Sequence, residues 1–477
     1  MNGTGGTTGP AADGLPARLA AIVGGAHVLT DPAAMSPFLT DQRGRYTGRA
    51  LAVVKPAAAA EVAAVVRACA EAGVAMVPQG GNTGLCGAAT PPPGGAALLI
   101  NLSRLDRIRA LDTGNDAIHA EAGCTLAAVQ RAAAAAGRLF PLALASGGSC
   151  EIGGALSTNA GGIHVLRYGN MRDLTLGLEA VLPDGRLWNG LRALRKDNSG
   201  YDLKQLFIGA EGTLGIITAA TLKLFPAPRT RASAWAAVPG PAAALALFAR
   251  LRAACGERVT AFELVGQALL ELVLEHIPRC RPPLSTPAPW AVLMELTDTA
   301  AGAPLAELLA RTLEAAIAAG EITDAALAAT LAQGENLWAL RENANEAQKR
   351  EGFSIKHDIS VPLDRIAEFI ARAGDALRTW LPGVRIVAFG HIGDGNLHYN
   401  LFPPRADAAF AARAAEANRI VYDLVDALGG SISAEHGIGQ LKREEIRRYK
   451  SAVELDLMRA VKHALDPRGL MNPGKVL

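Results

Sequence analysis

Three histidines and a glutamate in the last quarter of the chain have the types and spacing of a metal site. His391 and His398 flank a glycine-rich turn, and Glu435 and His436 follow downstream in a second glycine-containing segment. Two imidazoles and one carboxylate form the ligand set of catalytic zinc sites, which keep a position open for substrate. We therefore predict one divalent ion, zinc by preference, held by His391, His398 and Glu435. The alternative is that these are surface-loop histidines without a ligand.

A β-hairpin would bring the two histidines together. Residues 384–389 are apolar and β-branched, residues 397–402 alternate apolar and polar, and residues 393–396 are turn formers. If His391 and His398 are directly opposed across the hairpin, their Cβ atoms lie about 5 Å apart. Asn400 is two residues beyond His398 and would point to the same face.

Three glycine-rich segments in the first half of the chain predict a site for a large, extended cofactor. They span residues 78–87, 146–162 and 209–218. Glycines at this density let backbone N–H groups converge on phosphate oxygens. The first segment is neither a G-x-G-x-x-G fingerprint nor a P-loop, and taken alone it could be an ordinary turn.

The surrounding sequence indicates how these segments are positioned. Helices are expected over residues 15–25, 57–72 and 126–136, and strands over residues 50–54, 74–77 and 174–182. Further along, strands alternate with alanine-rich helices, which suggests an α+β cap on the substrate side. Those strands are expected over residues 232–238, 259–265, 290–297 and 355–361.

Composition excludes several classes of function. The chain has 477 residues and a net charge of +2 without a basic run, which argues against nucleic acid or an anionic membrane as partner. Its six cysteines form no C-x-x-C pair, which argues against an iron–sulfur cluster and fits a reducing compartment. The N-terminus does not read as a secretory signal, and no apolar stretch is long enough for a transmembrane segment. We expect a cytoplasmic protein.

Together these motifs resemble the FAD-linked D-2-hydroxyacid dehydrogenases, whose FAD domain is of the vanillyl-alcohol-oxidase type. The matching stretches are residues 78–84, 153–162, 212–215, 390–398, 433–437 and 472–475. The resemblance covers roughly residues 30–477 and implies an α+β fold in two parts. The expected organisation is a disordered tail (1–14), an FAD-binding domain (15–228), a substrate cap with the metal hairpin (229–430) and a C-terminal helical segment returning to the FAD domain (431–477).

The resemblance also implies the FAD contacts. Because the first glycine loop carries no histidine for a covalent flavin link, the FAD is expected to be non-covalent. The residues that match are Pro78, Gln79, Gly80, Gly81, Asn82, Thr83, Gly84, Leu85, Ser146, Gly147, Gly148, Gly153, Gly154, Ser157, Thr158, Asn159, Gly161, Gly162, Gly212, Gly215, Ile217 and Asn472.

On the substrate side the resemblance gives His436 the role of general base. It makes Arg341 and Lys356 cationic contacts, and Asn345 stands where the relative acting on 2-hydroxyglutarate has a threonine. A helix over residues 337–345 would put Arg341 and Asn345 on one face. With Asn400 these residues form the expected substrate site. Two buried cations favour a dicarboxylate, D-2-hydroxyglutarate or D-malate. If one cation instead pairs with a protein carboxylate, a monocarboxylate such as D-lactate or glycolate is expected.

The electrons are expected to leave to an external acceptor: an electron-transfer flavoprotein, a quinone or a cytochrome. A homodimer is possible from sequence. Two other functions stay open at this stage. One is a flavin-dependent transferase of the same fold without net oxidation, and the other is a non-catalytic flavin-binding subunit of a complex. The four polar residues 391, 398, 435 and 436 argue against the second, because a structural subunit needs no open metal position.

Overall fold

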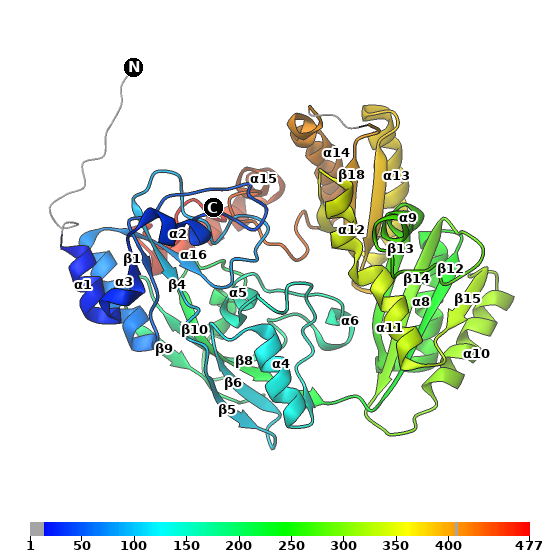
Figure 1. The fold of residues 1–477 in the computed structure, drawn as a ribbon, viewed down its shortest axis with the longest axis horizontal. Coiled ribbons are helices and arrows are strands. Elements are labelled where there is room, and N and C mark those ends of the chain that lie inside the picture. Colours follow the sequence, from blue (N-terminus) through cyan, green and yellow to red (C-terminus); the bar gives the residue numbers. More distant parts are fainter. Residues whose placement is uncertain (1–13, 406–408) are drawn as a thin grey trace.

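The computed structural model describes residues 14–405 and 409–477, which form two lobes that face each other (Figure 1). The predicted disordered tail, apart from Gly14, lies outside the described residues. The first lobe holds the N-terminal half of the chain and also the C-terminal helices α15 (Arg443–Tyr449) and α16 (Ala452–Leu465). The second lobe is built from the residues between them. The chain therefore leaves the first lobe and returns to it.

The first sheet of the first lobe has four strands. Their order is β1 (Val28–Leu29), β2 (Val53–Val54), β4 (Ala97–Asn101) and β3 (Ala75–Gln79), and β2, β4 and β3 are parallel. Helix α3 (Ala59–Ala72) packs with α1 (Leu15–Val23) on this sheet, and α2 spans Pro32–Leu39. Residues 62, 65, 66 and 69 of α3 are fully buried, at the spacing of one helical face. Gly73 ends α3 in the left-handed conformation that favours glycine.

The second sheet of the first lobe is antiparallel. Its order is β5 (Ile108–Asp112), β6 (Ala117–Glu121), β10 (Ile216–Lys223), β8 (Thr175–Val181) and β9 (Leu187–Gly190). Helices α4 (Leu126–Ala135) and α5 (Ile152–Ser157) bury their apolar side chains against it. The remaining short elements are α6 (Val165–Tyr168), α7 (Lys204–Phe207) and the pair β7 (Arg138–Leu139) and β11 (Phe225–Pro226).

The second lobe is a seven-stranded antiparallel sheet covered on both faces. Its strand order is β15 (Asp324–Leu327), β12 (Thr230–Val238), β14 (Trp290–Asp298), β13 (Val259–Gly266), β17 (Arg385–Gly390), β18 (Asn396–Phe402) and β16 (Asp358–Ser360). One face packs on α8 (Pro241–Cys255), α10 (Leu305–Ala318), α13 (Ile366–Trp380) and α14 (Ala414–Ala427). The other packs on α9 (Gln267–His276), α11 (Leu331–Glu342) and α12 (Ala344–Glu351). The hairpin of β17 and β18, where the metal site is expected, lies next to the edge strand β16.

Most predicted elements are present, with shifted ends. The helix expected over residues 57–72 begins at Ala59, and the strand expected over 50–54 is reduced to β2. The strand expected over 355–361 is likewise shortened, to β16. Within the described residues, no helix combines the length and apolar character needed to cross a membrane.

The single helix expected over residues 337–345 is wrong. The chain breaks at Asn343, between α11 and α12. The Asn343 side-chain amide donates to the carbonyl of Ala339 at 2.6 Å, a local bond that competes with the helical ladder. Arg341 and Asn345 therefore lie on different helices, and their expected shared face does not exist.

Candidate functional site

The predicted hairpin forms, as strands β17 and β18, but its register differs. Strands β17 and β18 pair antiparallel with His398 opposite Phe389, so His398 does not face His391. The chain leaves the ladder at Gly390, whose φ of +154° and close approach to the Asn396 carbonyl oxygen leave no room for a side chain. His391 follows directly, and its ring centroid still lies 5.9 Å from that of His398. The two imidazoles are therefore neighbours because β17 ends at Gly390, and not because the two histidines are paired across the hairpin.

Both imidazoles are oriented by a buried carboxylate. His391 Nδ1 donates to Glu263 Oε1 at 2.6 Å, and His398 Nδ1 lies 3.7 Å from Asp358 Oδ1. Their Nε2 atoms face the two oxygens of Glu435, at 3.8 and 4.0 Å respectively. Metal-binding histidines usually keep the second ring nitrogen on a carboxylate or carbonyl in this way. The three side chains thus fit one divalent ion.

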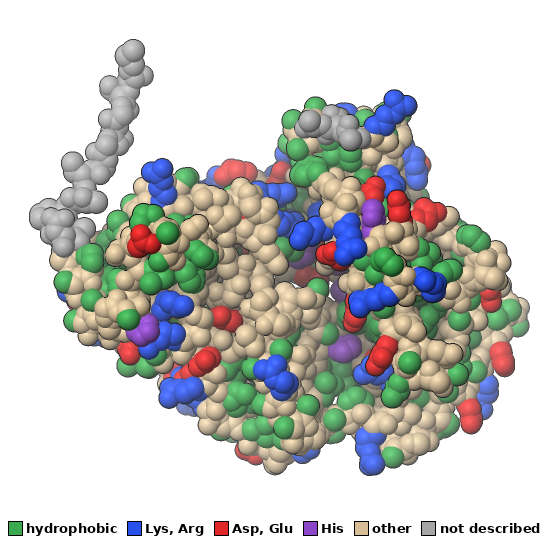
Figure 2. All heavy atoms as spheres, viewed as in Figure 1, with side chains coloured by type: hydrophobic (Ala, Val, Ile, Leu, Met, Phe, Trp, Pro, Cys, Tyr) green, Lys and Arg blue, Asp and Glu red, His purple; other side chains and the backbone are tan. Residues whose placement is uncertain are grey.

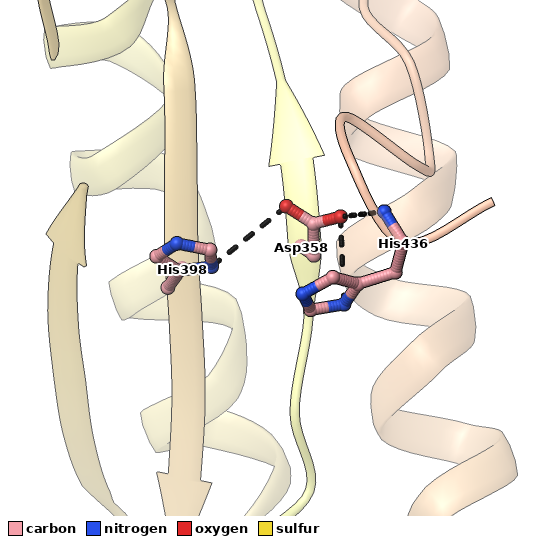
Figure 3. A group of neighbouring side chains, drawn as sticks. All are labelled: Asp358, His398 and His436. Atoms are coloured by element: carbon pink, nitrogen blue, oxygen red, sulfur yellow. Dashed lines mark hydrogen bonds and ion pairs between the residues drawn. The ribbon is translucent and has the colours of Figure 1, made fainter. Parts of the chain in front are cut away.

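Asp358 lies between His398 and His436 (Figure 3). Its Oδ2 accepts the backbone N–H groups of Glu435 and His436 at 2.9 and 3.0 Å and lies 3.5 Å from His436 Nδ1. Its Oδ1 accepts from Asn396 Nδ2 at 2.9 Å. Asp358, His398 and His436 are also close enough to hold an ion. Because the Asp358 oxygens already accept these bonds, we assign Asp358 to orienting both imidazoles, which leaves His436 Nε2 free.

Burial dominates the electrostatics of this cluster. It would lower the pKa of His391, but the Glu263 carboxylate outweighs it and raises that pKa to about 9. Burial lowers the pKa of His398 to about 3 and also lowers that of His436. It raises the pKa of Glu435. His398 is held neutral, the form in which imidazole binds a metal ion, whereas His391 has to release a proton when an ion binds.

Arg341 is not the unpaired cation that the sequence suggested. Its Nε donates to Glu263 Oε2 at 2.8 Å, and its guanidinium lies over the Phe389 ring at 4.8 Å. Among the described residues, its Nη groups have no hydrogen-bond partner. Glu263 therefore joins Arg341 to the His391 imidazole, and one half of the guanidinium is left for a ligand.

Lys356 is the cation without a partner: it makes no ion pair or hydrogen bond within residues 14–405 and 409–477. Burial, and then the charge of Arg43, lowers its pKa to about 8. After burial and the charge of Lys442, the charges of Arg43 and Lys356 also lower the pKa of His436, so both cations act on the site. Arg43 belongs to the first lobe and was missed by sequence analysis, because nothing distinguishes it from Arg45 or Arg49 nearby. Lys and Arg side chains gather where the lobes face each other (Figure 2).

The two predicted amide contacts differ in their surroundings. Asn345 is exposed at the start of α12. Asn400 is buried and donates to Gln348 Oε1 at 2.7 Å. The Asn400 side-chain amide is therefore already used within the protein, whereas that of Asn345 is exposed.

The three glycine-rich segments pack directly on one another. A side chain at Gly81 would collide with the carbonyl of Ser149, and one at Gly212 would collide with the Pro78 ring. Asn472 Nδ2 donates to the carbonyl of Glu211 at 2.7 Å, so the C-terminal segment joins them. Each segment also contains a non-glycine residue in the left-handed region. These are Asn82, Asn159 and Glu211, with Asn472 as the fourth, at φ of 53°, 49°, 51° and 45°.

Strained backbone of this kind concentrates at ligand sites. Gly84, Gly148 and Gly154 have no heavy atom within 4 Å of where a Cβ would lie, so their faces are open. Closed glycines between the segments and open glycines on their surface fit a cradle for an extended cofactor such as FAD.

Some predicted cofactor residues support the cradle instead of facing it. The Gln79 amide donates to the carbonyls of Phe38 and Ala89, and the hydroxyls of Ser157 and Thr158 donate to carbonyls one turn back. Ile217 is buried in β10 within the core of the second sheet. The side chains of these four residues are used within the protein.

The cofactor cradle is in contact with the predicted metal-binding group of His391, His398 and Glu435. A Cβ at Gly161 would lie 3.1 Å from Glu435 Oε1, and a hydrogen bond from the Gly162 N–H helps to stabilise the Glu435 carboxylate. Glu211 accepts the N–H groups of Ile438 and Gly439, both at 2.7 Å. The loop that carries Glu435 and His436 is therefore fastened to the cofactor cradle.

Comparison with known proteins follows this division. Residues 50–190 match the FAD binding domain family, and residues 227–476 match the C-terminal domain of the FAD linked oxidases. The chain is 39% identical over 465 residues to the mitochondrial D-2-hydroxyglutarate dehydrogenase of Bos taurus, covering 97% of this chain and 83% of the relative. It is 39% identical over 450 residues to the D-2-hydroxyglutarate dehydrogenase of Xanthomonas citri pv. viticola, covering 94% and 93%.

Among solved structures, p-cresol methylhydroxylase with substrate bound superposes with a TM-score of 0.76 at 16% identity, covering 99% of this chain and 98% of that one. A likeness at this identity concerns the fold. The fold is thus the FAD-binding domain of the vanillyl-alcohol-oxidase type with an α+β cap.

Proposed function

The chain belongs to the FAD linked oxidases and is an FAD-dependent D-2-hydroxyacid dehydrogenase, and from this premise we propose that it oxidises a D-2-hydroxy dicarboxylate to the 2-oxoacid with the help of a divalent metal ion. D-2-hydroxyglutarate is the first candidate and D-malate the second. Lys356 carries the proposal, because its ammonium group has no ion pair or hydrogen bond among the described residues and its charge, like that of Arg43, acts on His436. The curated relatives named D-2-hydroxyglutarate dehydrogenase agree with it.

His391, His398 and Glu435 would hold the metal, and the three glycine-rich segments would hold FAD. When bound, the ion supplies a Lewis acid that lowers the pKa of a hydroxyl, and the flavin supplies a two-electron acceptor for the C2 hydrogen. His436 accepts the hydroxyl proton at Nε2, because Asp358 occupies the side of its Nδ1. Glu263 and Asp358 keep the two ligand imidazoles in the orientation that presents Nε2.

The charges around the site argue for a second carboxylate on the substrate. Glu263 already balances Arg341, so this pair attracts a further anion weakly. Lys356 is partly buried and has no ion pair or hydrogen bond among the described residues, and Arg43 adds a second positive charge from the first lobe, so this side of the site favours an anion. A distal carboxylate would pair with both and could also reach the free Nη groups of Arg341. A charge-assisted hydrogen bond of this kind contributes about 1.5–3 kcal/mol.

A monocarboxylate such as D-lactate is the alternative to a dicarboxylate. The Arg341–Glu263 pair and the exposed Asn345 favour it, because both reduce the number of groups available to a distal carboxylate. In either case we propose that an external acceptor, such as an electron-transfer flavoprotein, a quinone or a cytochrome, receives the electrons.

Anaerobic mixing tests the assignment. Purified holoprotein is mixed with D-2-hydroxyglutarate, D-malate, D-lactate and D-2-hydroxybutyrate, and with the L-enantiomers, while bleaching of the flavin absorbance is recorded. We expect the D-dicarboxylates to reduce the flavin most efficiently. Arg43→Ala and Lys356→Met should each cost roughly tenfold or more in kcat/KM for the dicarboxylates and little for lactate. If D-lactate reduces the wild-type flavin most efficiently, and both variants lower kcat/KM equally for all substrates, the dicarboxylate assignment is wrong.

A further inference from the structure

A buried carboxyl group without a hydrogen-bond partner lies inside the cofactor cradle. Glu151 lies within the second glycine-rich segment, directly before helix α5, and the residue is only 7% exposed. No hydrogen bond to its side chain exists among the described residues, and Oε2 is buried without a partner. Such a group is costly to bury unless a ligand completes it.

The position of Glu151 indicates which ligand that is. A Cβ built on Gly80 would lie 3.2 Å from Glu151 Oε2, and a Cβ on Gly81 would collide with the Ser149 carbonyl. The carboxyl group therefore lies against the first glycine loop, whose backbone N–H groups form the expected nest for the FAD pyrophosphate. An ionised carboxylate there would repel the pyrophosphate, whereas a carboxylic acid can donate one hydrogen bond to it.

We propose that Glu151 binds FAD as a carboxylic acid, by donating its O–H to an oxygen of the pyrophosphate. This inference rests on the proposed function only in requiring that FAD is the cofactor.

The charges around Glu151 are consistent with the neutral form. Burial raises the pKa of Glu151 to about 8, against the lowering effect of Lys55 and with a smaller raising effect of Asp106. No other charged group contributes appreciably. A bound pyrophosphate would raise this pKa further, because two neighbouring negative charges disfavour ionisation.

The test compares Glu151→Gln, which keeps an N–H donor but cannot ionise, with Glu151→Ala, which has no donor. The FAD affinity of each apoprotein is measured by quenching of flavin fluorescence between about pH 6.5 and about pH 10. This range brackets the pKa of about 8. Near neutral pH we expect Glu151→Ala to bind FAD roughly 10- to 100-fold more weakly, the usual effect of losing one hydrogen bond to a charged acceptor. Glu151→Gln should stay within about threefold of the wild type.

Above pH 8 the wild type should lose affinity while Glu151→Gln does not, because only the wild type gains a negative charge. ADP, which carries a pyrophosphate but no flavin, should show the same loss with Glu151→Ala. Equal FAD affinity and equal pH dependence in all three proteins would overturn the inference, as would an alanine effect on FAD without any effect on ADP. Failure of the wild-type apoprotein to bind FAD would instead refute the proposed function. Matching unfolding midpoints of the three apoproteins serve as the folding control.

Discussion

Two buried carboxylates, Glu263 and Asp358, organise the chemistry at the scale of single residues. Glu263 receives both His391 and Arg341, and Asp358 receives two backbone N–H groups while facing His398 and His436. In His391, His398 and His436, the Nδ1 atom thereby faces one of these two carboxylates, and the Nε2 atom is left for the site. Carboxylates that bond to the second ring nitrogen of a histidine fix the orientation of the ring, and this raises metal affinity and reactivity.

The roles of ligand and base can be separated by a matched pair of variants. His398→Ala removes a metal ligand and should cause loss of the ion, a fall in activity of roughly 100-fold or more, and no loss of FAD. His436→Ala should keep both the ion and FAD but slow flavin reduction by roughly 100-fold, the usual contribution of a general base. Metal content by mass spectrometry and stopped-flow flavin reduction distinguish them. His276→Ala, in a histidine–carboxylate pair elsewhere, is the control.

The opposite pattern would reverse the assignment. If His436→Ala loses the ion while Glu435→Ala retains it, then Asp358, His398 and His436 would have to be reconsidered as the ligand set. Full activity in metal-free wild type would reject metal assistance altogether.

Lys356 predicts a pH dependence with a definite sign. Burial first and Arg43 second lower the pKa of its ammonium from 10.5 to about 8. A neutral amine cannot attract a carboxylate, so kcat/KM for D-2-hydroxyglutarate relative to D-lactate should fall as the pH rises through about 8, by roughly tenfold. Lys356→Arg keeps its charge over this range and should hold the ratio constant. A wild-type ratio that does not change with pH would contradict the role of Lys356.

For folding, the sign is the reverse. Between pH 8 and 10.5 the unfolded chain binds more protons at Lys356 than the folded chain does. The free energy of unfolding contributed by this group therefore rises with pH through that window, and the cost of burying the charge is fully present below pH 8. Urea unfolding of the wild type and Lys356→Met at several pH values measures the difference.

At the scale of elements, the end of strand β17 decides where His391 points. Gly390→Ala would place a methyl group 2.5 Å from the Asn396 backbone oxygen in a conformation with φ of +154°. We expect the hairpin to shift, the metal affinity to fall by at least about tenfold, and the unfolding free energy to drop by about 1–3 kcal/mol. Gly240→Ala is the control, because nothing lies within 4 Å of its Cβ position. Unchanged metal content in Gly390→Ala would show that the hairpin tolerates the methyl group.

The break between α11 and α12 is the second feature at this scale. Arg341 lies in the last turn of α11, where it can reach both Glu263 and the Phe389 ring. After Asn343, helix α12 begins at Ala344 and packs against α9.

At the scale of the whole molecule, Glu211 joins the cofactor cradle to the catalytic loop. Both of its oxygens accept backbone N–H groups from residues 438 and 439, more than 220 positions away in sequence. In Glu211→Gln, one of the two accepting oxygens would become an NH2 group, which would face the backbone N–H of Ile438 or Gly439 and could not accept it. We expect a loss of about 2–4 kcal/mol in the free energy of unfolding.

Hydrogen exchange tests this connection locally. The amides of residues 433–440 should exchange faster in Glu211→Gln, and metal affinity should fall because Glu435 lies in the same loop. Glu257→Gln, an exposed carboxylate in the second lobe, serves as the control. Exchange in this loop that matches the wild type would show that other contacts fasten it.

The sequence by itself determined the chemical groups and most of the elements. Glycine density marked the cradle, histidine and glutamate spacing marked the metal group, and helices such as α3 were placed to within about two residues. These features are local: they depend on backbone freedom, side-chain type and the period of an apolar face, all of which are present in a short stretch of chain.

Only the tertiary structure decided how the groups pair. Strand register set His398 against Phe389, and packing put Glu263 between Arg341 and His391, which lie 78 and 128 positions from it. The packing of the two lobes brought the charge of Arg43 close enough to act on Lys356, more than 300 positions away. Such pairings cannot be read from spacing along the chain, because their energy depends on burial and on which distant residue fills the facing position.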